Sequence, residues 1–218
     1  LYSYANFDEI ARNEDIDIVY IVLPNALHAE WVLRAAAAGK HVICEKPMAC
    51  TVEDCARMIA ACEAAGVELA IGYRMHYDPH QQQAMRLGQL GVAGRLREVR
   101  GGFGHKMEQG WRYDASLAGG GPLMDMGIYV LQAMQYATGA APLWVEARFG
   151  EKTKPEKFAT IEQSLSWAMG FPDGVVAHGE TSYNDSMDYL ELVTDRGKVR
   201  ISPSFAYSGQ AGQVLGAE

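Results

Sequence analysis

The sequence predicts an α/β region followed by an α+β region, and three observations support this prediction. Over the first 95 residues, apolar β-branched runs alternate with helix-forming stretches, a pattern typical of a parallel sheet whose helices connect the strands. From residue 96 onward, apolar and polar residues alternate and turn sequences separate the runs, which indicates antiparallel strands. One helix, from Pro122 to Gly139, interrupts this second region.

Three apolar runs in the first region are predicted to be parallel strands, at 17–23, 41–44 and 68–73. The first run ends in Pro24-Asn25 and the second in Glu45-Lys46-Pro47. The carboxyl ends of parallel strands meet at one edge of a sheet, which is where open α/β sheets bind ligands. We therefore expect these side chains to lie at a ligand-binding edge.

Capping residues mark the predicted helices of the first region. Each helix follows a side chain that can accept a hydrogen bond from a first-turn amide, and glycine ends the first two. The predicted N-caps are Asn25, Thr51 (with Asp54 three residues on) and Asp78 (before Pro79), the predicted ends are Gly39 and Gly66, and Gln81 completes a capping box in the third helix.

The second region has one apolar face. Its apolar positions alternate along two predicted hairpins whose turns are Pro172-Asp173-Gly174 and Asp195-Arg196-Gly197. They are Leu165, Trp167, Met169 and Phe171 before the first turn, and Leu190, Leu192, Val199 and Ile201 around the second.

The helix in the second region has two different stripes. One stripe is apolar: Met126, Val130, Met134 and Ala137. The other contains Asp125, Tyr129, Gln132 and Tyr136. A helix with a purely structural role would place apolar residues on both stripes, so we regard Asp125 and Tyr129 as candidates for chemistry.

The composition narrows the class of protein. An apolar fraction of 49% over 218 residues is that of a globular protein, and a net charge of −8 without charge runs argues against nucleic acid or an anionic membrane as a partner. No apolar stretch is long enough to span a bilayer. The four cysteines occur within residues 44–62 without a C-x-x-C pair, so we expect free thiols and no metal site. Free thiols favour a reducing compartment such as the bacterial cytoplasm, with the periplasm as the alternative.

A series of motifs resembles the Gfo/Idh/MocA family of oxidoreductases over nearly the whole chain. In order, they are Leu23-Pro24-Asn25 with His28, Glu45-Lys46-Pro47, the segment 72–79 (GYRMHYDP), Trp111-Arg112, and the segment 119–129 (GGGPLMDMGIY). Most members carry histidine at the last position of this series. The tyrosine found here, Tyr129, is similar to the glucose-fructose oxidoreductase branch.

The resemblance implies domains and assembly. It implies the C-terminal half of a dinucleotide-binding Rossmann domain over 1–95 and an α+β substrate and oligomerisation domain over 96–218. It further implies a Gly-rich segment upstream of Leu1 and more chain beyond residue 218, so we expect a fragment of a longer protein. A homo-oligomer is expected through the antiparallel sheet, because Trp144, Phe149, Trp167 and Phe171 offer large apolar surface.

The resemblance also implies roles for single residues. Hydride removal from a sugar hydroxyl carbon needs a base, and a phenol with a pKa of about 10 needs a nearby cation to act as one. Tyr129 would be that base, Lys46 the cation, and Asp125 a group that orients the sugar. Cofactor contacts are expected from Pro24, Asn25, His28, Glu45, Lys46, Arg74, Trp111 and Arg112. From the residues alone, Tyr129 could also be a core tyrosine, and Lys46 a lysine that only reaches solvent.

The activity implied is oxidation of an aldose at C1 to a lactone with NADP, or with NAD as the alternative. In the glucose-fructose branch a second sugar reoxidises the bound cofactor. Two further readings stay open: an aldose or inositol-type dehydrogenase that releases its cofactor, and a non-catalytic sugar- or nucleotide-binding scaffold.

Overall fold

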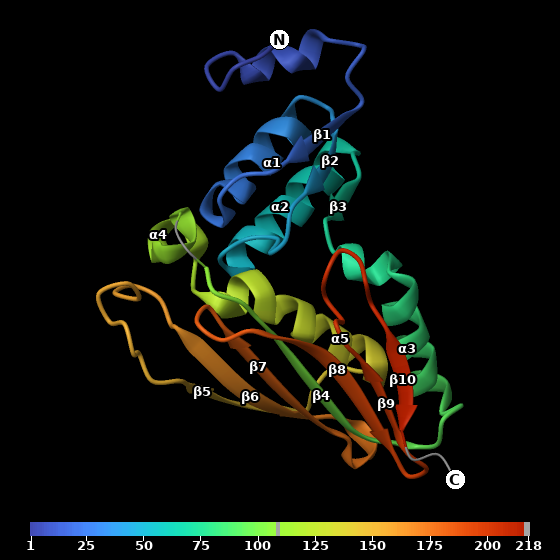
Figure 1. Cartoon of the computed structure of the whole chain (residues 1–218). Helices are drawn as coiled ribbons and strands as arrows, with labels where there is room; N and C mark the ends of the chain where they lie inside the picture. The colour runs from blue at the N-terminus through green and yellow to red at the C-terminus, as the bar shows by residue number, and fades with distance from the viewer. Residues whose placement is uncertain (108–109, 216–218) are drawn as a thin grey trace. The chain divides into compact units, whose positions relative to one another are not determined.

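The computed structural model describes residues 1–107 and 110–215 and divides into two compact units (Figure 1). The first unit comprises Leu1–Tyr73 and Gly110–Gly120, and the second comprises Arg74–Gln109 and Gly121–Glu218. Within the described residues, the first unit holds a three-stranded sheet and the second a seven-stranded sheet. The predicted fold class, part of a parallel Rossmann-type sheet followed by a mostly antiparallel one, is confirmed.

The sheet of the first unit is parallel, with strand order β1-β2-β3. Its strands are β1 (Ile18–Ile21), β2 (His41–Cys44) and β3 (Leu69–Ile71). Helices α1 (His28–Ala37) and α2 (Val52–Ala65) pack together on one of its faces (Figure 1). Their apolar side chains, among them Val32 and Met58, form a core with Val42 of β2.

Two predicted caps are present and two are wrong. The Thr51 hydroxyl accepts the amide of Asp54 at 3.1 Å, and Asp78 accepts the amides of His80 and Gln81, each at 3.0 Å. Asn25 does not cap α1, because a 3-10 turn, Asn25–Leu27, precedes that helix and the Asn25 side chain bonds elsewhere. Gln81 makes no capping box, because its buried amide donates to the carbonyl and hydroxyl oxygens of Ser204.

The sheet of the second unit has the order β10-β9-β8-β4-β7-β6-β5. Its strands are β4 (Leu96–Gly104), β5 (Trp144–Phe149), β6 (Ser164–Gly170), β7 (Val176–Ser182), β8 (Met187–Thr194), β9 (Lys198–Ile201) and β10 (Gly212–Leu215). Strands β4 and β7 pair in parallel, whereas the other neighbouring pairs are antiparallel.

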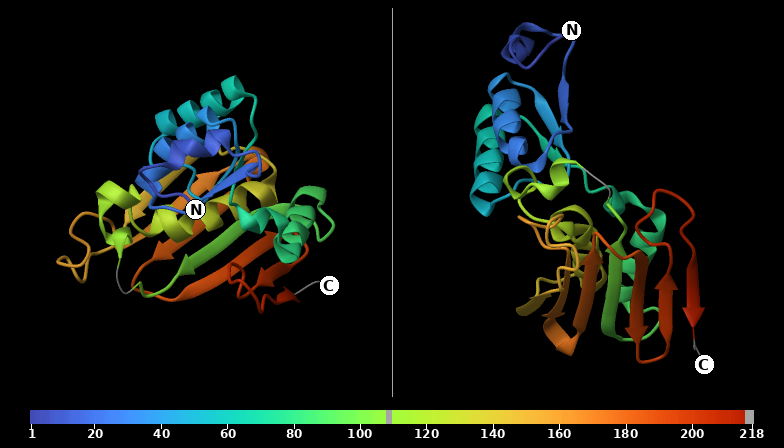
Figure 2. Two further views of the ribbon diagram at one scale, coloured as in Figure 1. Left: turned by 90° about the horizontal axis from the view of Figure 1, so that it is seen from above. Right: turned by 60° about the vertical axis from the view of Figure 1, so that its left-hand side comes forward.

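Helix α5 (Ile128–Thr138) covers one face of this sheet and contacts β4, β7 and β8 (Figures 1 and 2). The apolar stripe Met126, Val130, Met134 and Ala137 is buried, as predicted. Helix α3 (Pro79–Leu90) packs against α5 so closely that a Cβ atom at Gly88 would lie 2.2 Å from the carbonyl oxygen of Ala137. The structure thus groups α3 with the second unit, whereas the sequence placed it before a boundary at residue 95.

The helix predicted from Pro122 begins with a π-helical turn, Leu123–Gly127, before α5. The Pro122 carbonyl, at the start of this turn, accepts the Thr181 hydroxyl at 3.3 Å. A Cβ atom at residue 127 would lie 2.9 Å from the Leu123 side chain, so glycine allows the close approach. Single π turns are frequent at functional sites, and this one carries Asp125.

Candidate functional site

The carboxyl edge of the smaller sheet carries Glu45, directly after β2. Its carboxylate accepts the Tyr20 hydroxyl of β1 and, at 3.1 Å, the amide of Lys46. Across the sheet, a Cβ atom at Gly72 would lie 3.3 Å from the Glu45 carboxyl carbon. Glycine after β3 therefore leaves room for the carboxylate, which lies across the ends of all three strands.

His28 joins two of these strand ends. It is fully buried, and its Nδ1 and Nε2 atoms each lie 2.9 Å from a main-chain carbonyl oxygen, that of Pro47 and that of Leu23. Leu23 follows β1 and Pro47 follows β2, so the ring fixes the spacing of the two loops. The expected contact of His28 with the cofactor stays a prediction.

The segment Gly110–Gly120 returns to the first unit and packs on the same loops. The buried Asn25 amide donates to the Ala118 carbonyl at 2.8 Å, next to the end of the short helix α4 (Ala115–Ala118). A Cβ atom at Gly119 would lie 2.6 Å from the Cys50 sulfur. In a 3-10 turn of this segment, the Arg112 guanidinium lies 4.7 Å from the Trp111 ring centroid.

In the second unit, Tyr129 lies within an aromatic cluster at the start of α5. It is 7% exposed, and its ring centroid is 5.8 Å from Phe103 and 6.5 Å from Phe205. These rings fix the orientation of the phenol. Phe205 is itself fully buried.

Asp125 lies one turn before Tyr129. The hydroxyl of Tyr183, a residue that is 1% exposed, donates to its carboxylate at 3.1 Å. A hydrogen-bonded carboxylate and a phenol thus come from successive turns of one helix. Such a pair can bind two hydroxyl groups of a polyol.

Arg74 contacts Tyr129 directly, a contact that the sequence did not predict. Its guanidinium carbon lies 5.3 Å from the Tyr129 ring centroid and 4.0 Å from that of Tyr207. Its terminal nitrogens donate to the carbonyls of Phe205 and Ala206. Tyr183, Phe205 and Tyr207 were also missed, because no local spacing links them to Tyr129.

The predicted site residues divide between the two units. The first unit contains Pro24, Asn25, His28, Glu45, Lys46, Trp111 and Arg112, and the second contains Arg74, Asp125 and Tyr129. The expectation that Lys46 and Tyr129 reach one shared substrate oxygen stays a prediction.

The thiols are free in the structure, as the sequence predicted. Burial, helped by the nearby Glu45 carboxylate, raises the pKa of Cys44 to about 12, so it is an inert thiol at neutral pH. Residues 1–107 and 110–215 include no group of three or more His, Cys, Asp or Glu side chains placed to hold a metal ion. No helix in those ranges has the length and apolarity needed to cross a membrane.

Two family models match the chain. Residues 1–73 match the model of an oxidoreductase family with an NAD-binding Rossmann fold, and residues 81–205 match the GFO/IDH/MocA C-terminal domain. The chain therefore belongs to the Gfo/Idh/MocA family of oxidoreductases, and the predicted family is confirmed.

Similar proteins act on sugars, as their names state. The chain is 34% identical over 211 residues to a D-xylose 1-dehydrogenase [NADP(+)] of Haloarcula marismortui, covering 93% of this chain and 58% of that protein. It is 42% identical to the aldose-aldose oxidoreductase of Caulobacter crescentus, solved with glycerol, with a TM-score of 0.95 over all of this chain and 66% of that one.

A 3-ketoreductase of Actinomadura kijaniata, solved with NADP and TDP-benzene, shares the fold at 24% identity. Its TM-score is 0.82, over 100% of this chain and 69% of that one. The chain spans about three fifths of the length of the first curated relatives, 58% and 62%.

Proposed function

We propose that the complete protein oxidises an aldose at its anomeric carbon to the lactone, with NADP as the hydride acceptor. The observation that supports this most is the placement of Asp125 and Tyr129 on successive turns, one held by Tyr183 and the other by an aromatic cluster. The sugar dehydrogenase and aldose oxidoreductase relatives support the same substrate class. NAD is the alternative cofactor.

The strand ends of the first unit fit the nicotinamide part of such a cofactor. Glu45 offers carboxylate oxygens at the carboxyl edge, and the absence of a side chain at Gly72 gives this carboxylate the room it occupies there. Pro24, Asn25 and His28 would form the loop beneath the cofactor, with Arg74, Trp111 and Arg112 as further contacts. When bound, the cofactor supplies the carbon that accepts the hydride.

The chain's own residues would handle the hydroxyl proton and orient the sugar. In this mechanism Tyr129 accepts the proton of the C1 hydroxyl, and Lys46 supplies positive charge to the same oxygen. Asp125, oriented by Tyr183, accepts a hydrogen bond from a second sugar hydroxyl. The buried position of Tyr129 limits competition by water.

Isotopic labelling of the sugar tests the proposal. The full-length protein is incubated with NADP and an aldose carrying deuterium at C1, and the reduced cofactor is examined by mass spectrometry. We expect deuterium in the cofactor and a lactone trapped by hydroxylamine. The same aldose labelled at C3 is the control, and transfer from C3 would contradict oxidation at C1.

Cofactor release separates the open alternatives. Reduced cofactor retained by protein purified without additives, and reoxidised by a second sugar, would support coupled turnover of two sugars. Cofactor lost on gel filtration would support a dehydrogenase that exchanges it each turnover. No reduction with any aldose would leave a sugar- or nucleotide-binding scaffold.

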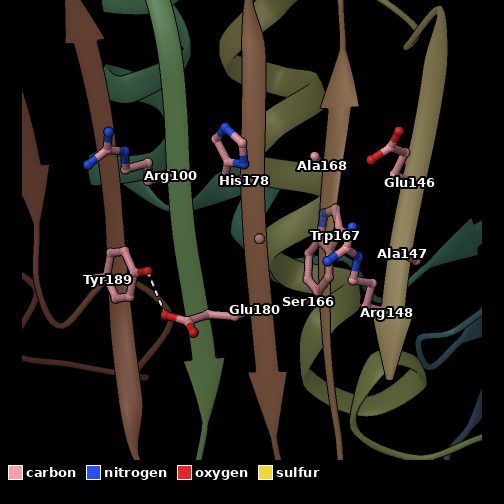
Figure 3. Close-up of a pocket in the computed structure, with 11 residues that line it drawn as sticks. Arg100, Glu146, Ala147, Arg148, Ser166, Trp167, Ala168, His178, Glu180 and Tyr189 are labelled. Atoms are coloured by element: carbon pink, nitrogen blue, oxygen red, sulfur yellow. Dashed lines mark hydrogen bonds between the residues drawn. The ribbon is translucent and has the colours of Figure 1, made fainter. Parts of the chain in front are cut away.

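We also propose that the face of the larger sheet turned away from α5 binds a second copy of the chain. Figure 3 shows this face, with Arg100, His178, Glu180 and Tyr189 projecting from β4, β7 and β8. One ion pair and one hydrogen bond lie on it: the Arg100 Nε is 2.7 Å from Glu98, and the Tyr189 hydroxyl donates to the Glu180 carboxylate at 2.7 Å. Paired charges cost less to bury than single ones.

The residues expected to supply apolar surface need correction. Trp167 and Phe171 are 5% and 3% exposed, because they pack into the core beneath α5. Trp144 is 46% exposed and covers Gly170 on the open face, whereas the register of β5 places Phe149 on the opposite face. Of the four, Trp144 alone supports the proposed interface.

Sedimentation of the full-length protein tests this assembly. Ser166 projects from β6 onto the same open face, so Ser166→Arg should place a large charged side chain in the interface and shift the oligomer toward monomer. Ala64→Arg, on the exposed side of α2, is the matched control. A wild-type monomer at micromolar concentration would contradict the proposal.

A further inference from the structure

Arg74 provides a fixed cation at the ring of Tyr129. We propose that Arg74 is a positioning residue that holds this phenol in place and favours its ionised form. The inference rests on the proposed function, in which Tyr129 accepts the hydroxyl proton. In the sequence analysis, Lys46 was the cation expected to favour the Tyr129 phenolate, and this inference gives that role to Arg74.

The distance between the two groups supports this role. The Arg74 guanidinium carbon lies 5.3 Å from the Tyr129 ring centroid, within the range of cation–π attraction. A phenolate ring carries more negative charge than a phenol ring, so the same contact becomes stronger once the proton is lost. The guanidinium therefore stabilises the ionised form more than the neutral one.

Main-chain carbonyls fix the guanidinium without neutralising it. Its two terminal nitrogens donate to consecutive carbonyls, Phe205 and Ala206, a match to the planar fork of arginine. This segment is held in turn by Asp188, whose Oδ1 accepts the amides of Ser204 at 2.6 Å and Phe205 at 2.7 Å. The position of the cation is thus set before any substrate arrives.

Tyr207 covers another part of the same guanidinium. Its ring centroid lies 4.0 Å from the Arg74 carbon although the residue is 87% exposed. Gln210 stabilises the residue before Tyr207, because the Gln210 amide donates to the Ala206 carbonyl at 2.6 Å. By excluding water, Tyr207 reduces the screening of the charge that acts on Tyr129.

The other titratable groups around Tyr129 come from several elements of the second unit. Asp125 lies one turn earlier, its carboxylate bonded to Tyr183 after β7, and its charge opposes ionisation of the phenol. His105 follows β4, with its ring 6.2 Å from Phe103. Asp188 of β8 is directed at the Ser204 and Phe205 amides. Arg74 places its positive charge over the face of the Tyr129 ring.

Ultraviolet difference titration of the full-length protein reads the ionisation of Tyr129 itself. Each protein is compared with its Tyr129→Phe counterpart, so that the remaining tyrosines cancel. Arg74→Gln removes the charge, and we expect the half-titration pH of Tyr129 to rise by about one unit, the lower end for a charge at this range. Arg74→Lys keeps the positive charge but loses the planar guanidinium. Its half-titration pH for Tyr129 should therefore lie between those of the wild type and Arg74→Gln.

Two variants of Tyr207 test the inference even if Arg74→Gln does not fold. Tyr207 is exposed, so its replacement leaves the core intact. Tyr207→Ala should raise the half-titration pH by less than Arg74→Gln does, and Tyr207→Phe, which keeps the ring, should leave it unchanged. Identical titrations in the alanine and phenylalanine variants would overturn the role of the covered guanidinium.

The pH profile of kcat/KM on an aldose separates this inference from the proposed function. If both hold, the acidic limb of the profile moves upward in Arg74→Gln by the same amount as the Tyr129 titration. An unchanged Tyr129 titration in Arg74→Gln overturns the inference, whatever the activity. If the Tyr129 titration shifts in Arg74→Gln but the acidic limb of kcat/KM does not, Arg74 does act on the phenol, and Tyr129 is refuted as the base.

Discussion

Glu191 of β8 is a buried carboxylate held by two cations, and its removal should destabilise the second unit. The residue is 5% exposed; Lys198 Nζ lies 3.4 Å from it, and Arg200 contacts its other oxygen. Burial by itself would raise the pKa of Glu191, but the hydrogen bond and charge of Arg200, together with Lys198, lower it below its ordinary value. Glu191→Gln keeps the shape and removes the charge.

The expected loss is about 2 kcal/mol at pH 7. Breaking a fully buried ion pair costs about 3–5 kcal/mol, whereas exposed pairs contribute about 0–1 kcal/mol. The Lys198 and Arg200 side chains are 37% and 40% exposed, so the cost should lie between these limits. Urea denaturation followed by tryptophan fluorescence measures it, with Glu146→Gln, at an exposed carboxylate of β5, as the control.

The dependence on pH gives the sharper test. Because the pKa of Glu191 is lower in the folded state than the unfolded value of 4.5, its stabilisation is present above that value and is lost as the pH falls through the folded pKa. The difference between wild type and Glu191→Gln should therefore be full at pH 7 and shrink below about pH 4. If Glu191→Gln lowered the free energy of unfolding equally at pH 7 and below about pH 4, the electrostatic reasoning would be refuted. Several protein concentrations should be used, because Glu191 lies on the proposed interface.

Three further changes have defined outcomes. Lys46→Met should lower turnover by at least ~100-fold, the scale of losing one charge-stabilising group, and near-normal turnover would assign the role to another residue. Gly88→Ala should cost about 1–3 kcal/mol in a urea unfolding experiment, because its Cβ would meet the Ala137 carbonyl; an unchanged midpoint would mean that α3 and α5 separate freely. Thr51→Ala should lose about 1 kcal/mol through the missing cap of α2, whereas Thr51→Ser should retain it, and equal losses in both would contradict a role for the hydroxyl.

The sequence predicted features that depend on local chemistry. Thr51 and Asp78 cap the helices they precede, and the stripe ending at Ala137 is buried, because capping and periodicity act over one or two turns. The carboxyl edge with Glu45 followed from the parallel strands. The family followed from motifs that are short and local.

Features that depend on tertiary contacts were not predicted. Gln81 fits a capping box by sequence, yet Ser204, 123 residues away, takes its amide. Arg74 was expected at the cofactor, and no spacing in the sequence places it on Tyr129 or on the Phe205 carbonyl. Trp167 and Phe171 belong to the alternating apolar face that the sequence predicts, and only the position of α5 shows that the helix of the same unit covers this face.

The contact of Asn25 with Ala118 has a consequence for folding. The two residues are 93 positions apart, and β4 lies between them in the chain. The segment Leu1–Tyr73 therefore does not complete the first unit without Gly110–Gly120. During synthesis it must wait for the segment 110–120, and closing so long a loop makes this a late, non-local step. A single cut near residue 95 would leave the Asn25 amide without its carbonyl, at a cost of about 1–3 kcal/mol for a buried polar group. Separating the two units experimentally therefore requires a permuted chain in which residues 110–120 are joined directly to the strands they cover.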